Sequence, residues 1–215
     1  GSSVTVDYDV PDGPGSSNTV TKFELGSAST INLQGRNLVV EDTASIAGLI
    51  AATSGSFTAT HPSSILAGDR ALLRANTSAN PSDSADITVG ASGTWTVTSS
   101  AVKNTTILSA DGSNASVSLA TLATINSYAD HWGTNTRTIS AINGGFIDLS
   151  GLTQLRGGSG THGGTDSVKV VTKTGGQIDL SNLQQVDGYV TFSTDASAFT
   201  LPSLIHAGGV QYQLP

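Results

Sequence analysis

Short stretches of alternating apolar and polar residues recur along the chain, and each is followed by leucine at a fixed distance. In the second half of the sequence, an apolar–polar–apolar triplet is followed by two small or polar residues and then Leu. The alternation has the two-residue period that is typical of a strand with one buried face. The Leu that follows predicts a corner that turns back into the core. The segments with this pattern are 117–122, 147–152, 178–183 and 199–204.

A second apolar position and pairs of glycines support the repeat. Gly-Gly precedes the strand at 144–145 and at 175–176, as a tight corner requires. Another apolar residue follows the Leu in each copy. These residues are Ile125, Leu155, Val186 and either Ile205 or Ala207. We therefore predict that each segment belongs to one coil of a stacked repeat.

Weaker copies extend the repeat toward the N-terminus, with irregular spacings of roughly 20 to 40 residues. Irregular spacing around a constant strand motif is typical of a parallel β-solenoid, in which loops of any length can leave the corners. The predicted fold class is therefore all-β, a single-stranded right-handed parallel β-helix of about seven irregular coils. Its predicted inward column is Ile31, Phe57, Trp95, Val117, Ile147, Ile178 and Phe199.

Two further segments complete the predicted organisation. Residues 1–29 are assigned to an N-terminal arm or cap, and residues 30–215 to the solenoid domain. The apolar residues of segment 44–52 have helical spacing, with Asp42 or Thr43 as a suitable N-cap. We expect a short helix there, covering the first coils.

Composition narrows the classes of function. Only 12% of the 215 residues are charged, and the formal net charge is -7. A protein that binds nucleic acid or an anionic membrane needs clustered Lys and Arg, so we expect neither nucleic acid nor membrane insertion. Cys and Met are absent, which excludes disulfides, zinc–thiolate sites and thiol nucleophiles. No apolar run is long enough for a membrane-spanning helix.

The coil pattern resembles that of the right-handed parallel β-helix superfamily of large secreted bacterial proteins. Members include polysaccharide lyases, pectin-active hydrolases, tailspikes and surface adhesins. The resemblance covers about residues 30–210 and lies in the coil pattern, because the Ile-Asp-Leu-Ser-x-Leu element is not a catalytic signature of any one family. It implies an extracellular or cell-surface location, a polysaccharide or cell-surface glycan as partner, and a place within a larger multidomain chain.

Two coils are longer than the shortest coil, and their additional residues follow the same corner. The additional segments are 126–135 and 157–166. When they are aligned, His131 falls on His162, and Asn135 falls on Asp166. Neighbouring coils would therefore hold these pairs of residues side by side.

The longer loops, 126–137 and 157–169, are the predicted ligand-binding site. Aromatic side chains there can stack on sugar rings, and the polar side chains can bind sugar hydroxyls. The alternative is that the two loops only pack on each other and bind nothing. The candidate residues are Tyr128, Asp130, His131, Trp132, Asn135, Arg137, Arg156, His162, Asp166 and Lys169.

Acidic residues suggest calcium at two places, and we expect no other cofactor. Asp148 and Asp179 fall in one outward column, where stacked carboxylates repel unless water, a neighbour or a cation screens them. Near the N-terminus, Asp7, Asp9 and Asp12 resemble an acidic calcium loop with one inserted residue and no closing Glu. The alternatives are solvent screening or pairing with Lys173 or Lys169 at the first place, and a flexible acidic arm at the second.

The predicted function is that of a non-catalytic extracellular module that binds polysaccharide laterally through its longer loops. A structural stalk or adhesin segment of a giant surface protein is the first alternative. A polysaccharide lyase or hydrolase is the second. An enzyme would need an acid and a base beside a metal or an oxyanion-binding group, and no such set stands out from the repeat. We therefore expect no catalytic residues.

Overall fold

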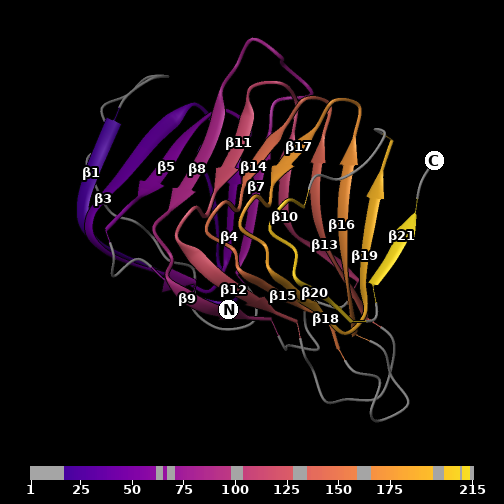
Figure 1. Ribbon diagram of the computed structural model, residues 1–215. Helices are drawn as coiled ribbons and strands as arrows, with labels where there is room; N and C mark the ends of the chain where they lie inside the picture. The colour runs from indigo at the N-terminus through magenta and orange to yellow at the C-terminus, as the bar shows by residue number, and fades with distance from the viewer. Residues whose placement is uncertain are drawn as a thin grey trace.

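Parallel strands, joined by turns and loops, make up the described part of this protein (Figure 1). Among the residues described here, no helix occurs, and so no helix that could cross a membrane. All strand pairs in this part of the chain are parallel, and they assemble into three sheets, named here A, B and C. The computed structural model describes residues 17–61, 65–66, 71–97, 104–127, 135–158, 166–195, 201–208 and 210–213.

Sheet A follows the order β1-β3-β5-β8-β11-β14-β17, and β6 pairs with β3 beside this path. It begins at Ser17, within the segment that the sequence assigned to an arm or cap. Its strands are β1 (Ser17–Leu25), β3 (Arg36–Ile46), β5 (Gly55–Ala59), β6 (Ile65–Leu66), β8 (Ala85–Val89), β11 (Ala115–Ser118), β14 (Phe146–Asp148) and β17 (Gln177–Asp179).

Sheets B and C are also built from strands far apart in the sequence. Sheet B contains, in order, β2 (Thr30–Asn32), β4 (Leu49–Ala52), β7 (Leu72–Asn76), β10 (Thr105–Asp111), β13 (Asn135–Ile142), β16 (Asp166–Lys173), β19 (Val190–Thr194) and β21 (Val210–Gln213). Sheet C contains β9 (Gly93–Thr96), β12 (Leu122–Asn126), β15 (Gln154–Arg156), β18 (Gln185–Asp187) and β20 (His206–Ala207).

The chain visits the sheets in rotation, so each round adds one strand to each sheet. From β7 to β19 the order is B, A, C, repeated (Figure 1). Successive rounds pair in register, and Ser116 therefore lies between Asp86 and Phe146 in sheet A. This arrangement is consistent with a parallel β-solenoid, in which residues one round apart become neighbours.

Inward side chains from all three sheets form one apolar core. Fully burying a large apolar side chain contributes about 1.5–3 kcal/mol, so these columns are a main source of stability. The sheet A column includes Leu38, Phe57, Ile87, Val117 and Ile147. The sheet C column is Trp95, Ile125, Leu155 and Val186, and the sheet B column includes Ile50, Leu73, Leu108, Ile139, Val170 and Phe192.

The predicted inward column was correct in part. Val117, Ile147 and Ile178 are in register, as expected. Trp95 and Ile31, however, belong to sheets C and B, so the prediction mixed residues from different faces. Between Phe57 and Val117, the residue of sheet A in register with both is Ile87. The sequence did not indicate Ile87, because its strand has no glycine pair before it and no Leu after it.

The sequence left open whether Ile205 or Ala207 is the last member of the sheet C column. Of the two candidates, Ala207 pairs with Val186, but it is exposed and does not enter the core. Ile205 is 83% exposed and lies outside the column.

The helix expected over 44–52 is wrong. The segment contains the end of β3 and all of β4. Ala44 and Ile46 alternate with less buried residues, as do Ile50 and Ala52, which is the period of a strand. The apolar spacing allowed either period, and parallel pairing with β1 and β7 decides for the strand.

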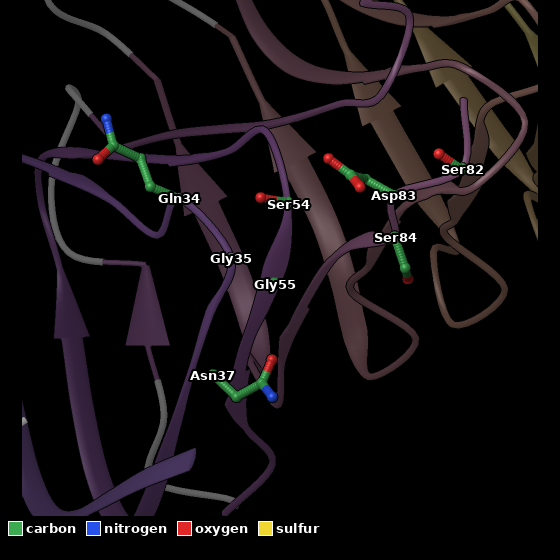
Figure 2. Close-up of a pocket in the computed structure, with 8 residues that line it drawn as sticks. All are labelled: Gln34, Gly35, Asn37, Ser54, Gly55, Ser82, Asp83 and Ser84. Carbon is green, nitrogen blue, oxygen red and sulfur yellow. The ribbon is translucent and has the colours of Figure 1, made fainter. Parts of the chain in front are cut away.

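A polar hollow lies where the chain passes from sheet B to sheet A in the first rounds (Figure 2). Its volume is about 570 Å³. Glycine and polar residues line it, namely Gln34, Gly35, Asn37, Ser54, Gly55, Ser82, Asp83 and Ser84.

Candidate functional site

The corners that lead from sheet C to sheet B, called here the C–B corners, carry the candidate site. Between β12 and β13 the connection is long, and so is the connection between β15 and β16. In the next round only Gly188 and Tyr189 separate β18 from β19. Gly188 has φ of 70°, a left-handed conformation that glycine adopts without strain. The predicted contrast between long and short connections is therefore present, although the connection from β9 to β10 is as long as that from β12 to β13.

Much of the two long connections lies outside the described residues. This applies to Tyr128, Asp130, His131, Trp132 and His162, whose neighbourhood therefore remains a prediction. The residues at the ends of the connections are described and can be compared with the expected alignment.

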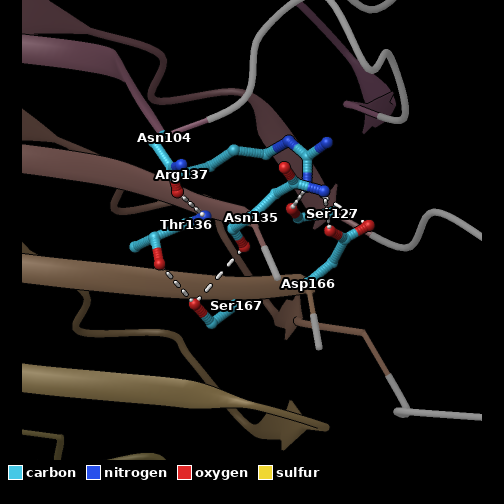
Figure 3. Close-up of polar contacts among 7 residues, drawn as sticks. All are labelled: Asn104, Ser127, Asn135, Thr136, Arg137, Asp166 and Ser167. Carbon is cyan, nitrogen blue, oxygen red and sulfur yellow. Dashed lines mark hydrogen bonds and ion pairs between the residues drawn. The ribbon is translucent and has the colours of Figure 1, made fainter. Parts of the chain in front are cut away.

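The two long connections end in register. Asn135 pairs with Asp166 as the first residues of β13 and β16. The Asn135 Nδ2 donates a hydrogen bond of 2.8 Å to Asp166 Oδ1, and both residues are buried. The hydroxyls of Thr136 and Ser167, one position further along, are 2.9 Å apart (Figure 3). The alignment made from the sequence is therefore confirmed at this position.

A buried ion pair supports the same corners (Figure 3). The Arg137 side chain is fully buried, and its Nη1 lies 3.5 Å from Asp166 Oδ2. The same nitrogen donates a hydrogen bond of 3.2 Å to Ser127 Oγ, at the end of β12. Burial of a charge is costly unless a partner of opposite charge and hydrogen bonds compensate it. Here each residue is the charged partner of the other, and hydrogen bonds reach Arg137 Nη1 and Asp166 Oδ1, whereas Arg137 Nε and Asp166 Oδ2 make none.

This burial changes the role of three residues predicted to contact a ligand. Asn135, Arg137 and Asp166 are all enclosed within the protein. They position the strands that enter and leave the C–B corners, whereas an external polysaccharide would meet other side chains.

Exposed polar side chains gather around Asp187 on sheet C. The Asp187 Oδ2 accepts hydrogen bonds from Gln154 Nε2 at 3.1 Å and from Gln185 Nε2 at 2.7 Å. The Arg156 Nε lies 4.0 Å from the same oxygen, and His206 Nε2 lies 3.4 Å from Oδ1. These five residues come from three successive rounds of the chain and are called here the Asp187 cluster.

An aromatic side chain follows the cluster directly in the sequence. Tyr189 forms the short C–B corner two residues after Asp187, and it is 40% exposed. Lys169, another predicted site residue, is half-buried on β16 between Thr138 and Thr191 of the neighbouring strands. The exposed groups of this corner therefore include an aromatic ring, hydrogen-bond donors and hydrogen-bond acceptors.

The sequence pointed to Arg156 but missed the other members of this surface. Gln154, Gln185, Asp187, Tyr189 and His206 were not candidates. A signal was present, because the offset of 31 residues that relates Asn135 to Asp166 also relates Arg156 to Asp187.

The two outward aspartates predicted as a calcium site are in register, Asp148 on β14 and Asp179 on β17. Each caps the turn that follows it. Asp148 Oδ1 accepts from the Ser150 backbone N–H at 3.0 Å, and Asp179 Oδ1 accepts from that of Ser181 at 2.9 Å. Asp148 Oδ2 also accepts from Ser118 Oγ at 3.1 Å.

Within the described ranges, no three His, Asp or Glu side chains come together as a set that could hold a metal ion. The other predicted calcium ligands, Asp7, Asp9 and Asp12, lie outside those ranges.

No match to this chain was found among protein-family models, curated proteins or solved structures. Function is therefore inferred from the geometry of the C–B corners.

Proposed function

We propose that this chain is a non-catalytic extracellular module that binds polysaccharide laterally at its C–B corners. In this proposal the fold is a right-handed parallel β-solenoid of about seven coils, and the module is part of a larger cell-surface protein. The observation that carries the proposal is the Asp187 cluster at the C–B corners, with Tyr189 exposed two residues after Asp187 in the sequence.

The chemistry of this surface suits a sugar. An exposed aromatic ring can cover the apolar face of a pyranose, and amide, guanidinium and imidazole groups can bind its hydroxyls. Tyr189 supplies the ring, while Arg156 and His206 supply donors that are 48% and 62% exposed. Trp132 and His131 would add a second ring and a further polar group from the long connection, as expected from the sequence.

The buried pair beneath the corners favours a preformed site. The ion pair between Arg137 and Asp166 fixes the first residues of β13 and β16, and the Asn135 side chain joins the two strands by a hydrogen bond. A binding surface that is already ordered loses less conformational entropy when the ligand arrives, which favours affinity.

A structural stalk is the alternative that another observation favours. Short polar side chains on the outer face of sheet A bond between successive rounds. Ser56 Oγ donates to Asn37 Oδ1 at 2.9 Å, and Ser116 Oγ donates to Asp86 Oδ1 at 2.6 Å. Such ladders stabilise a rod without any ligand. The polar side chains of this face are therefore explained by a structural role.

Binding to insoluble polysaccharides separates the proposal from both alternatives. The wild-type protein and the Tyr189→Ala variant would be incubated with a panel of neutral and acidic polysaccharides, and the retained fraction measured. We expect retention by the wild type and its loss in the variant, with unchanged melting temperature. Retention of neither protein on any polysaccharide or glycan array would favour the stalk. New reducing ends or unsaturated products would favour a hydrolase or a lyase.

A further inference from the structure

The polar hollow between sheets B and A is separate from the C–B corners. It is formed by the corners before β3 and β5 and by the loop before β8 (Figure 2). Its volume of about 570 Å³ falls within the range of about 300–1,000 Å³ that is usual for small-molecule sites. Nothing in the proposed polysaccharide surface uses this hollow.

Glycines form the inner wall of the hollow. Gly35 and Gly55 both have φ of 84°, and a Cβ on Gly55 would clash with the backbone of Arg36. Backbone hydrogen bonds stack the corners, from Gly35 N to Ser54 O at 2.9 Å and from Gly55 N to Ser84 O at 2.8 Å. The glycines therefore allow successive corners to stack closely, and the polar side chains among the lining residues are left to contact a ligand.

Two of the polar side chains that line the hollow, Asp83 and Asn37, carry the argument for a ligand. Asp83 is the one charged residue among those that line it, and its half-buried carboxylate points toward Ser54 (Figure 2). Asn37 accepts a hydrogen bond from Ser56 Oγ at its Oδ1, which orients the amide and leaves its Nδ2 as the donating group. The hollow is thus lined by a carboxylate, an amide and several hydroxyls.

We propose that this hollow binds one neutral sugar unit. The Asp83 carboxylate accepts hydrogen bonds from two adjacent hydroxyls, and the Asn37 amide donates to an oxygen on the same ring. A carboxylated or phosphorylated ligand is disfavoured because Asp83 would repel it. An ammonium ion alone gains little from a single partly exposed carboxylate, whereas several hydroxyl contacts add together.

The proposal is tested by NMR titration of the 15N-labelled protein. The probes are methyl glucoside, methyl mannoside and methyl galactoside, with glucuronate and glucosamine as charged comparisons. We expect saturable shifts at the backbone amides of Gly35, Gly55 and Ser84 with at least one neutral glycoside. Asp83→Ala should weaken this binding about tenfold or more, because the hydroxyl donors lose their acceptor.

Matched variants keep the test specific. Asp111→Asn changes a half-buried aspartate at the next corner from B to A, outside the hollow, and should bind like the wild type. Asn37→Ala provides a second variant should Asp83→Ala fail to fold, and it should also weaken binding. The proposal is overturned by the absence of saturable shifts with all neutral glycosides, by binding of glucosamine or glucuronate alone, or by equal affinity in the variants. These outcomes do not depend on the C–B corners, so failure here leaves the proposed polysaccharide surface untouched.

Discussion

The Arg137 guanidinium and the Asp166 carboxylate form a fully buried ion pair, with Nη1 and Oδ2 3.5 Å apart. They lie on neighbouring strands of sheet B, at the point where the two long connections re-enter the sheet. The pair therefore ties the position of both C–B corners to the packing of the core.

Loss of one member of this pair should be strongly destabilising. Arg137→Ala or Asp166→Ala leaves a buried charge without its partner, and we expect the free energy of unfolding to fall by about 3–5 kcal/mol. Urea denaturation measures the loss. The control is Arg156→Ala, which removes an exposed partner of Asp187 and should cost less than about 1 kcal/mol. Equal effects of the buried and the exposed substitution would contradict the role assigned to the pair.

The register of sheet A predicts that substitutions at adjacent positions change the free energy of unfolding by very different amounts. Ile87 is fully buried between Phe57 and Val117, so Ile87→Ala should lower the free energy of unfolding by about 2–5 kcal/mol. Thr88 faces outward, and Thr88→Ala should change it by only about 0.5 kcal/mol. Thermal or urea unfolding of both variants decides, and similar losses at the two positions would show that the register is wrong.

The glycine pair at 175–176 gives a test of the corners. Gly175 has φ of 78°, and the space that a methyl group would occupy there is open, so Gly175→Ala should cost about 1–2 kcal/mol through backbone strain alone. A methyl group on Gly176 would instead clash with the Ala141 carbonyl of the previous round. Gly176→Ala should therefore cost about 3 kcal/mol or more. Melting temperatures that fall in the reverse order would argue against this close stacking.

Because the two outward aspartates cap turns, replacing either one should lower the free energy of unfolding modestly. Removing the acceptor for the Ser150 N–H in Asp148→Ala should cost about 1 kcal/mol, and Asp179→Ala should behave alike at Ser181. Because each carboxylate already has a structural partner, we expect calcium to leave the melting temperature unchanged. A calcium-dependent increase that disappears in the Asp148→Asn, Asp179→Asn double variant would instead establish the calcium site considered from the sequence.

Much of the all-parallel architecture could be predicted from local patterns. The apolar–polar–apolar triplets followed by Leu aligned Val117, Ile147 and Ile178 correctly, because all three have Leu two and five positions later. Ile87 was missed because it has no Leu at those positions. The segment 44–52 has apolar spacing that fits either a helix or a strand, and only its pairing with distant strands decides between them.

The candidate site was less predictable, for a similar reason. Chain order and residue type pointed to Asn135, Arg137 and Asp166, but only the packing shows that they are buried. The Asp187 cluster joins residues from β15, β18 and β20, strands of two or three residues that have no recognisable motif of their own. Their proximity depends on the register between rounds, which individual residues do not reveal.

The most direct test of the account is the affinity of the C–B corners for a polysaccharide that retains the wild-type protein. Isothermal titration with a soluble fragment measures this affinity for the wild type and for three variants. The variants are Tyr189→Ala, a double variant that combines His131→Ala with Trp132→Ala, and Thr88→Ala on sheet A as the control. We predict that the first two variants weaken binding at least tenfold at unchanged melting temperature, while Thr88→Ala binds normally. Wild-type affinity in both corner variants would contradict the proposal.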